Sequence, residues 1–310
     1  MTPNDPALQI LVDRVHSARA AGAQLCIRGG GTKDFYGEPP QGEWLDTRVL
    51  EGTSSYEPTE LVVTTRCGTA LADLEALLAT RGQCLPFEPP RFGPGGTVGG
   101  MVAAGLSGPP RAATGSLRDH LLGATLLNGQ CEVLTFGGQV MKNVAGYDVS
   151  RLLAGSLGML GVILEVSLKV LPVAPATATL RFQLDQAEAL ERLHAWGGEP
   201  LPINASAWRD GTLLLRLRGA LAAVQAAIHG LGGELIAPAD ATPFWDGLRD
   251  HHDEFFVRAA AAVDSGGALW RLSVPPTAPV LALSGEQLVE WGGGQRWLCS
   301  AVPAAQVRDA

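Results

Sequence analysis

The chain has 310 residues, of which 46% are hydrophobic and 17% charged, and its formal net charge is −8 at pH 7. This length favours two domains, each large enough to bury a core of its own. The acidic balance and the lack of a basic stripe argue against a nucleic-acid-binding surface.

The cysteine pattern argues against metal centres and for a reducing compartment. The five cysteines are odd in number and never lie within four residues of one another, so no CxxC or iron–sulfur spacing occurs. The N-terminus has neither a basic segment nor an apolar core typical of a secretion signal. We therefore expect a cytoplasmic protein without a metal site.

A long uncharged stretch runs from Phe92 to Pro110, but it contains seven glycines and three prolines. Such a segment cannot form a membrane-spanning helix. We expect no direct membrane span, and any association with a membrane would come through partner subunits.

The first half of the chain alternates strands and helices with glycine-rich segments. Apolar spacing predicts a helix over residues 5–21 that ends at Gly22, followed by a short strand that leads into a glycine triplet. Asn128-Gly129 predicts a two-residue hairpin turn, and Gly137-Gly138 predicts another. The short strand is expected at 25–27, and the hairpin around Asn128-Gly129 is expected within 125–135. Further strands are expected at 61–65, 84–87, 140–147 and 162–170, and further helices at 71–78 and 148–154.

The second half shows an α+β pattern. A hairpin is predicted at Asp210-Gly211, and one helix is expected to begin near Phe244 and continue to Arg258. The Ala/Pro-rich piece 171–178 is the candidate linker, so we place one domain at 1–172 and a second at 173–310. Other elements are expected as strands at 179–184, 267–274 and 296–302 and helices at 186–195 and 221–231.

Three glycine-rich segments can bring backbone amides close to a pyrophosphate, because glycine alone adopts positive φ without strain. They are residues 28–33, 95–100 and 155–161. Taken singly, each is most simply a turn or a tight packing site. None matches the GxGxxG fingerprint that opens a βαβ helix, and none is a Walker A loop, which disfavours Rossmann and P-loop folds.

In their order along the chain, these segments resemble the FAD-binding domain of the vanillyl-alcohol oxidase and p-cresol methylhydroxylase (PCMH) flavoproteins. The run 136–148, followed by Arg151-Leu152 and Gly155-Ser156-Leu157-Gly158, resembles more closely the FAD-binding subunits of bacterial glycolate oxidase of the E type. The resemblance covers about residues 5–172. It implies an α+β fold, with a two-subdomain PCMH-type domain followed by a smaller α+β cap domain.

The resemblance also implies roles for individual residues. The first two glycine segments would hold the FAD pyrophosphate, a third group would lie along the flavin, and residues 161–163 would lie by the adenine end. The expected cofactor-binding residues are Arg28, Gly29, Gly30, Gly31, Thr32, Lys33, Gly95, Gly96, Thr97, Val98, Gly99, Gly100, Ser107, Gly108, Arg118, Asp119, Gly161, Val162 and Ile163.

Many relatives carry a histidine after the first glycine loop, and its ring nitrogen bonds covalently to the flavin. Here that position is Thr32, whose hydroxyl cannot replace the histidine, so we predict non-covalent FAD. Lys33 and Lys142 could place positive charge near the pyrophosphate or the flavin N1 atom. For Lys33 an ordinary solvated lysine is an equal alternative, and for Lys142 a structural role is favoured.

The catalytic residues are not evident from the sequence. His251, His252, Arg249 and Arg258 are candidates in the cap, but two adjacent histidines on one helix diverge by about 100° and could not readily share a metal. The histidine-rich metal motif of relatives that act alone is missing from 173–310. The family's Asp-Pro…Asn-Pro-Gly type of ending is missing too, so we expect a shortened cap.

Two main hypotheses follow from the resemblance. In the first, the chain is an FAD-dependent dehydrogenase subunit for a small 2-hydroxy acid such as glycolate, and it passes electrons to an iron–sulfur subunit. In the second, it is a structural flavin-domain partner that supports a sister FAD-binding catalytic subunit. A weaker third reading keeps the fold but assigns an oxidase or a cell-wall-type reductase with another substrate.

Overall fold

The computed structural model describes residues 5–138 and 147–310, and its contacts divide the chain into two compact units. The first unit comprises Met1–Ser107 and Gly115–Val173, and the second comprises Gly108–Thr114 and Ala174–Ala310. The short segment Gly108–Thr114, assigned above to the first domain, therefore packs within the second unit. Lys142 and most of the strand predicted at 140–147 lie outside the described residues.

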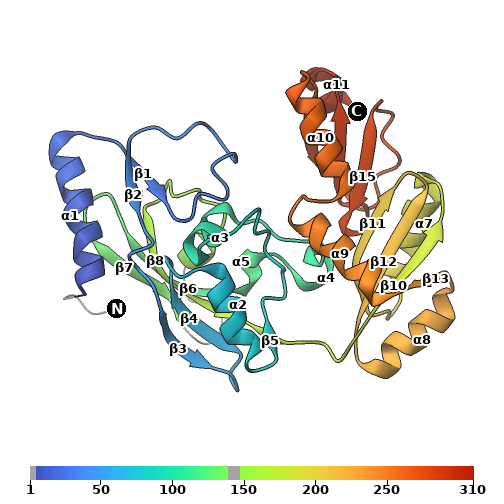
Figure 1. Cartoon of the computed structure of the whole chain (residues 1–310), viewed down its shortest axis with the longest axis horizontal. Coiled ribbons are helices and arrows are strands. Elements are labelled where there is room, and N and C mark those ends of the chain that lie inside the picture. Colours follow the sequence, from blue (N-terminus) through green and yellow to red (C-terminus); the bar gives the residue numbers. More distant parts are fainter. Residues whose placement is uncertain (1–4, 139–146) are drawn as a thin grey trace. The chain divides into compact units, whose positions relative to one another are not determined.

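The first unit is built on a five-stranded antiparallel sheet with the order β3-β4-β8-β6-β7 (Figure 1). Two small pairs accompany it, with β1 parallel to β2 and β5 antiparallel to β9. Its elements are α1 (Pro6–Ala21), β1 (Leu25–Arg28), β2 (Glu43–Asp46), β3 (Thr53–Glu57), β4 (Val62–Arg66), α2 (Leu71–Ala79), β5 (Gln83–Cys84), α3 (Val98–Ala104), α5 (Leu117–His120), β6 (Leu121–Leu127), β7 (Val133–Gly137), α6 (Val149–Leu152), β8 (Val162–Lys169) and β9 (Leu171–Pro172).

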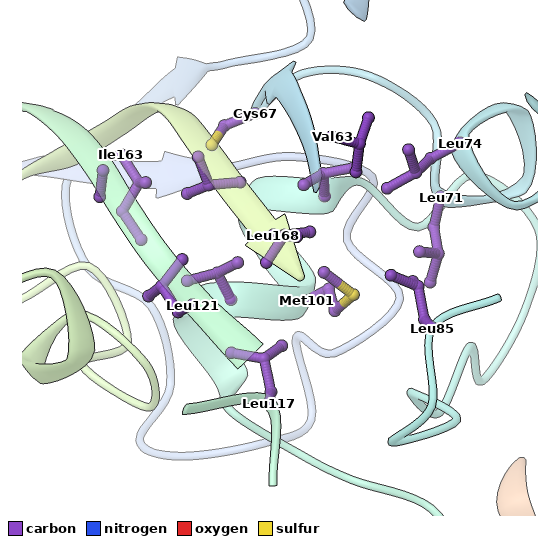
Figure 2. Close-up of a cluster of buried hydrophobic side chains, with 14 of the residues drawn as sticks. Val63, Cys67, Leu71, Leu74, Leu85, Met101, Leu117, Leu121, Ile163 and Leu168 are labelled. Carbon is purple, nitrogen blue, oxygen red and sulfur yellow. The ribbon is translucent and has the colours of Figure 1, made fainter. Parts of the chain in front are cut away.

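The central strand β8 is apolar on both faces, which is why it reads as a nearly continuous hydrophobic run. One face contributes Ile163 and Leu168 to a core shared with α2 and α3, part of which is drawn in Figure 2. The other face contributes Val162 and Leu164 to a second cluster, which includes Leu11 of α1. Strand β8 is therefore buried between two cores of the first unit.

The second unit is built on a seven-stranded antiparallel sheet with the order β13-β10-β12-β11-β15-β16-β14. Its elements are α4 (Arg111–Thr114), β10 (Ala176–Gln183), α7 (Gln186–Gly197), β11 (Ile203–Arg209), β12 (Thr212–Gly219), α8 (Leu221–Leu231), β13 (Glu234–Ile236), α9 (Pro238–Arg249), α10 (Glu254–Asp264), β14 (Ala268–Ser273), β15 (Glu286–Glu290), the short turn η1 (Trp291–Gly293), β16 (Gln295–Ser300) and α11 (Ala304–Asp309).

Strand alternation in β12 divides its side chains between two cores. Leu213, Leu215 and Leu217 pack with α7 and α8, whereas Leu214 contributes to the cluster that holds Trp245 of α9 and Phe255 of α10. Successive residues of a strand point to opposite faces, so a single sheet can carry a helical layer on each side.

Most of the predicted elements are confirmed. The helix at 5–21 is α1, with Asp5 accepting a hydrogen bond from the Ala7 amide (3.0 Å) and Gly22 in the left-handed region at φ 63°. The helix predicted at 221–231 matches α8, and the turn at Asp210-Gly211 joins β11 to β12 with positive φ at both residues. The elements that were not predicted are strands β2, β3, β9, β13 and β15 and helices α3, α4, α5 and α11.

Two predictions are wrong in detail. Strands β6 and β7 are joined by five residues rather than two, because the Asn128 Oδ1 atom accepts hydrogen bonds from the amides of Gln130 (2.9 Å) and Glu132 (3.0 Å). The helix expected to run from Phe244 to Arg258 is two helices, α9 and α10. The break comes at His251, which adopts φ 56°, and Asp253 caps the second helix.

Among residues 5–138 and 147–310, no helix is both long enough and apolar enough to cross a membrane.

Candidate functional site

The first glycine segment begins where β1 ends, and it lies directly against the second. A Cβ atom added to Gly29 would lie 2.2 Å from the Thr97 Oγ1 atom, and one added to Gly30 would lie 1.6 Å from the Gly95 carbonyl oxygen. Since Cβ atoms do not approach other atoms under 3.0 Å, this contact requires glycine at both positions. The two segments, 65 residues apart between Gly30 and Gly95, meet face to face.

The second segment is anchored to the sheet behind it. The Gly99 amide donates to the Cys67 carbonyl (2.8 Å), and a Cβ atom on Gly99 would lie 2.8 Å from the Cys67 Cβ atom. Thr97 precedes α3, and its Oγ1 atom accepts a hydrogen bond from the Gly100 amide (3.2 Å). These contacts place the start of α3 against the loop that follows β1.

The third glycine segment packs against the end of α3 and against β1. The Gly155 amide donates to the Val102 carbonyl (3.0 Å), and the Leu157 amide donates to the Ala103 carbonyl (2.9 Å). A Cβ atom on Gly158, which has φ 77°, would lie 3.3 Å from the Ile27 Cδ1 atom. All three segments therefore converge within the first unit.

The three segments enclose a cavity of about 480 Å³, a volume in the range of small-molecule and cofactor sites. Sixteen of its residues come from the stretch between Leu25 and Trp44 that contains the first segment. Its lining is Leu25–Asp34, Tyr36–Glu38, Pro40, Gln41, Trp44, Thr47, Thr97, Gly99, Gly100, Ala103, Ala104, Leu157–Met159, Gly161 and Ile163. A second hollow of about 660 Å³ shares Gly30 and Thr97 with it.

The charged residues at the cavity hold one another in place. The Arg28 guanidinium pairs with Asp34 (2.6 Å) and lies 4.8 Å from the centre of the Trp44 ring. This pairing keeps the pKa of Arg28 above its ordinary value, so the group carries positive charge throughout the physiological range. Burial, assisted by Asp34, raises the pKa of the Cys26 thiol, which therefore stays protonated at neutral pH.

Comparison with known proteins connects this geometry to a family. A family model described as an FAD binding domain matches residues 9–137. Over 299 residues, the chain is 45% identical to glycolate oxidase subunit GlcE of Escherichia coli (strain K12), which covers 96% of this chain and 82% of that protein.

The chain belongs to the family of glycolate oxidase subunit GlcE.

More distant matches of this GlcE-family chain are confined to parts of longer proteins. It is 28% identical over 162 residues to glycolate oxidase subunit GlcD of Bacillus subtilis (strain 168), and these residues are 52% of the chain and 33% of GlcD. It is 29% identical over 144 residues to a mitochondrial D-lactate dehydrogenase [cytochrome] of Arabidopsis thaliana, covering 46% of the chain and 25% of that protein.

A solved structure of alkyldihydroxyacetonephosphate synthase has the same fold, with a TM-score of 0.64, 13% identity, and coverage of 97% of this chain and 71% of that one. The family relationship confirms the expected resemblance, and it establishes FAD as the cofactor of this GlcE-family chain.

The cavity of the GlcE-family chain has the features that a dinucleotide requires. Among the residues that the structure describes, the backbone amides of Gly29, Gly30, Gly31 and Thr32 donate to no protein acceptor. Convergent amides of this kind suit the oxygens of a diphosphate. The Ser156 hydroxyl belongs to the third segment but not to the cavity lining, and it is buried without a hydrogen-bond partner in the described part of the chain.

The predicted cofactor-binding residues fall into two groups. Eleven of them line the 480 Å³ cavity, and they are Arg28, Gly29, Gly30, Gly31, Thr32, Lys33, Thr97, Gly99, Gly100, Gly161 and Ile163. Gly95 lines the second hollow. The side chains of Val98 and Val162 are buried in the two cores of the first unit, and Gly96 accepts a hydrogen bond from the Leu71 amide (2.8 Å).

The residues expected along the flavin have local roles in the described structure. Ser107 Oγ accepts from the Leu117 amide (3.2 Å), and the Asp119 carboxylate accepts from the Ser116 amide (2.8 Å), which lowers the pKa of Asp119. Arg118 is exposed. Gly108 belongs to the second unit.

Sequence reasoning missed several residues of the cavity wall, including Trp44, Thr47 and Met159. Trp44 and Thr47 come from β2 and the turn after it, an element that was not predicted. Met159 stands between two glycines of the third segment and is 85% exposed. A methionine so exposed within a glycine run is a signal that could have pointed to the site.

The catalytic candidates in the second unit are engaged in local contacts. Arg249 pairs with Asp250 (2.7 Å), and Arg258 pairs with Glu286. His251 stacks on the Phe256 ring with centroids 3.9 Å apart, and burial lowers the pKa of His251 to about 4. His251 does not lie on a continuous helix, as the sequence analysis assumed, because it lies in the break between α9 and α10. Within the described residues, no group of three potential ligands could hold a metal ion.

Proposed function

We propose that this chain is the FAD-carrying subunit of a complex that oxidises glycolate or a related D-2-hydroxy acid, and that it passes electrons to an iron–sulfur subunit. One observation carries the proposal. Three glycine segments, spread over residues 28–161, meet around one cavity of the first unit with the close backbone approach that a diphosphate needs.

The roles of the cavity residues follow from their positions. The amides of Gly29–Thr32 would hold the diphosphate from one side, and Thr97, Gly99 and Gly100 would face it from the other. Gly161 and Ile163 would lie at the adenine end. Assignment of Ser107, Gly108, Arg118 and Asp119 to the flavin rests on the resemblance alone.

The reaction converts a 2-hydroxy acid to a 2-oxo acid with release of two electrons and two protons. FAD supplies a two-electron acceptor for this step when it is bound. The protein must bind the carboxylate, orient the substrate and accept the hydroxyl proton. Onward transfer to a quinone would proceed through an iron–sulfur partner, and a sister flavin-bearing subunit would complete the complex.

One observation favours the alternative, in which the chain is a flavin-bearing partner without a catalytic site of its own. Three candidate catalytic groups make contacts within the second unit. Arg249 and Arg258 form ion pairs, and His251 stacks on an aromatic ring. In that case the sister subunit would oxidise the substrate.

An anaerobic titration separates the two functions. The purified, FAD-loaded chain is mixed with glycolate, D-lactate or L-lactate in separate cuvettes, and the flavin absorbance band is recorded. Bleaching by glycolate or D-lactate, and not by L-lactate, supports the proposal. Unchanged absorbance of the isolated chain, together with bleaching of the assembled complex, assigns the chemistry to the sister subunit.

A further inference from the structure

An ion pair spans the first glycine segment from one end to the other. Arg28 is the last residue of β1 and begins the segment, and Asp34 follows it directly. The Arg28 Nε and Nη2 atoms both donate to the Asp34 Oδ2 atom, at 2.9 Å and 2.6 Å. A Cβ atom on Gly31 would lie 2.3 Å from the Arg28 Nη2 atom, so the guanidinium lies against the middle of the loop.

Arg28 is also held by residues outside the loop. Its guanidinium carbon lies 4.8 Å from the centre of the Trp44 ring, which belongs to the neighbouring strand β2. Its carbonyl oxygen accepts a hydrogen bond from the Thr47 amide (2.9 Å). An aromatic face and a carboxylate together restrict the orientation of a planar guanidinium. Both the backbone and the side chain of Arg28 are therefore fixed.

The loop itself is costly to order. Among the described residues, the amides of Gly29–Thr32 donate to no protein acceptor, although Gly29 and Gly30 pack on the second segment. Gly31 has φ 73°, and glycine loses more conformational freedom on ordering than any other residue. A contact that closes the loop therefore reduces the entropy loss that accompanies FAD binding.

A carboxylate is unexpected at a site for a diphosphate. Asp34 lines the same cavity as the glycine amides, where an unpaired negative charge would repel phosphate oxygens. Pairing with Arg28 cancels this charge and engages the guanidinium that the sequence analysis assigned to the cofactor. The two side chains are 42% and 40% exposed, and exposed ion pairs add little to overall stability. The pair therefore acts on the local conformation of the loop.

We propose that Arg28 and Asp34 are positioning residues for FAD, which hold the first glycine segment in its binding conformation before the cofactor arrives. Arg28 acts through Asp34 and the loop, and its guanidinium is not a ligand of the diphosphate. Asp34 was not among the residues selected from the sequence. The inference rests on the proposed position of the diphosphate at Gly29–Thr32, and it adds the contact that keeps those amides convergent.

Fluorescence titration of the full apo chain with FAD tests the proposal through the sign of one effect. Asp34→Asn removes a negative charge beside a diphosphate, so electrostatics alone would tighten FAD binding. The proposal requires the opposite. Asp34→Asn and Arg28→Gln should each weaken binding about three- to fivefold, the upper range for an exposed ion pair. The double variant should bind as well as either single variant, because both changes break the same contact.

Asp46→Asn is the matched control. Asp46 pairs with Arg48 at the same 2.6 Å separation and is 47% exposed, but the two residues lie only two positions apart and enclose no glycine loop. Asp46 is not among the residues that line the cavity. This variant should bind FAD within about twofold of wild type.

Stopped-flow kinetics separates a positioning role from a direct contact. Breaking the ion pair lowers the fraction of chains whose loop is ready to bind, so FAD association should slow about three- to fivefold while dissociation is unchanged. Loss of a direct contact to the diphosphate would mainly accelerate dissociation. Unchanged or tighter FAD binding by Asp34→Asn would overturn the inference, and so would a loss by Arg28→Gln that lies entirely in the dissociation rate.

This inference and the proposed diphosphate position fail in different ways. If Gly30→Ala weakens FAD binding whereas Asp34→Asn does not, the diphosphate position stands and the positioning role is wrong. If neither variant changes FAD binding, the diphosphate lies elsewhere and both are wrong.

Discussion

Substitution of Gly30 by alanine is a direct test of the cavity. The new Cβ atom would lie 1.6 Å from the Gly95 carbonyl oxygen, which is backbone and cannot rotate away. The two loops would have to separate by roughly 1.4 Å to reach the 3.0 Å that real Cβ contacts respect. Such a shift moves the amides of both segments away from a shared diphosphate.

The expected magnitude follows from that displacement. Overpacking of this kind costs about 2–3 kcal/mol, and each 1.4 kcal/mol corresponds to a factor of ten in affinity. We therefore expect Gly30→Ala to weaken FAD binding about 30- to 100-fold. Fluorescence titration of the apo chain with FAD measures the dissociation constant, and circular dichroism of the apo chain reports whether the fold is retained.

The matched control lies in the facing loop. A Cβ atom on Gly96 would meet nothing closer than the Thr32 Oγ1 atom at 3.4 Å, which is ordinary van der Waals contact. Gly96→Ala should therefore bind FAD within about twofold of wild type. If Gly30→Ala bound FAD as tightly as Gly96→Ala, the two segments would not act as one diphosphate cradle, and the account of the site would be refuted.

Three further predictions concern the cofactor linkage and the stability of the second unit. With Thr32 in place of the histidine that forms the covalent bond in relatives, acid precipitation should release all FAD into the supernatant, and a pellet that stays yellow after washing would contradict this. Burial raises the pKa of Glu290 from 4.5 to about 7, so the folded chain keeps a proton that the unfolded chain has lost. The free energy of unfolding should therefore fall by about 3 kcal/mol as the pH rises from about 4.5 to 7, and Glu290→Gln should remove this dependence in urea unfolding at pH 5 and pH 8. On α10, Phe255→Ala should lower the unfolding free energy by about 3–5 kcal/mol, because this ring is fully buried, whereas Val257→Ala, at a residue 60% exposed, should change it by less than about 0.5 kcal/mol. Equal losses for the two variants in thermal or urea unfolding would contradict the assigned packing.

Local features of the sequence were sufficient for many elements of the fold. Helix α1 could be predicted because its apolar spacing and its end at Gly22 are properties of neighbouring residues. The turn at Asp210-Gly211 was predictable for the same reason, since two residues with positive φ define it. Where a side chain redirected the backbone, local reasoning failed, as at Asn128 and at the break near His251.

The glycine segments show which features of the site the sequence predicts and which only the tertiary structure decides. Their composition and order along the chain suggested a diphosphate site and a family. The contact of Gly30 with Gly95, however, depends on how β1 and α3 pack within the first unit. No local sequence pattern predicts that packing. Likewise Arg111 and Arg271 are separated by 160 residues, and only the packing of Gly108–Thr114 within the second unit brings them to Trp291. Residue types determined what chemistry this protein can perform, and long-range packing decided which of those residues meet, because side-chain contacts between distant segments form only when the sheets and their helices are assembled.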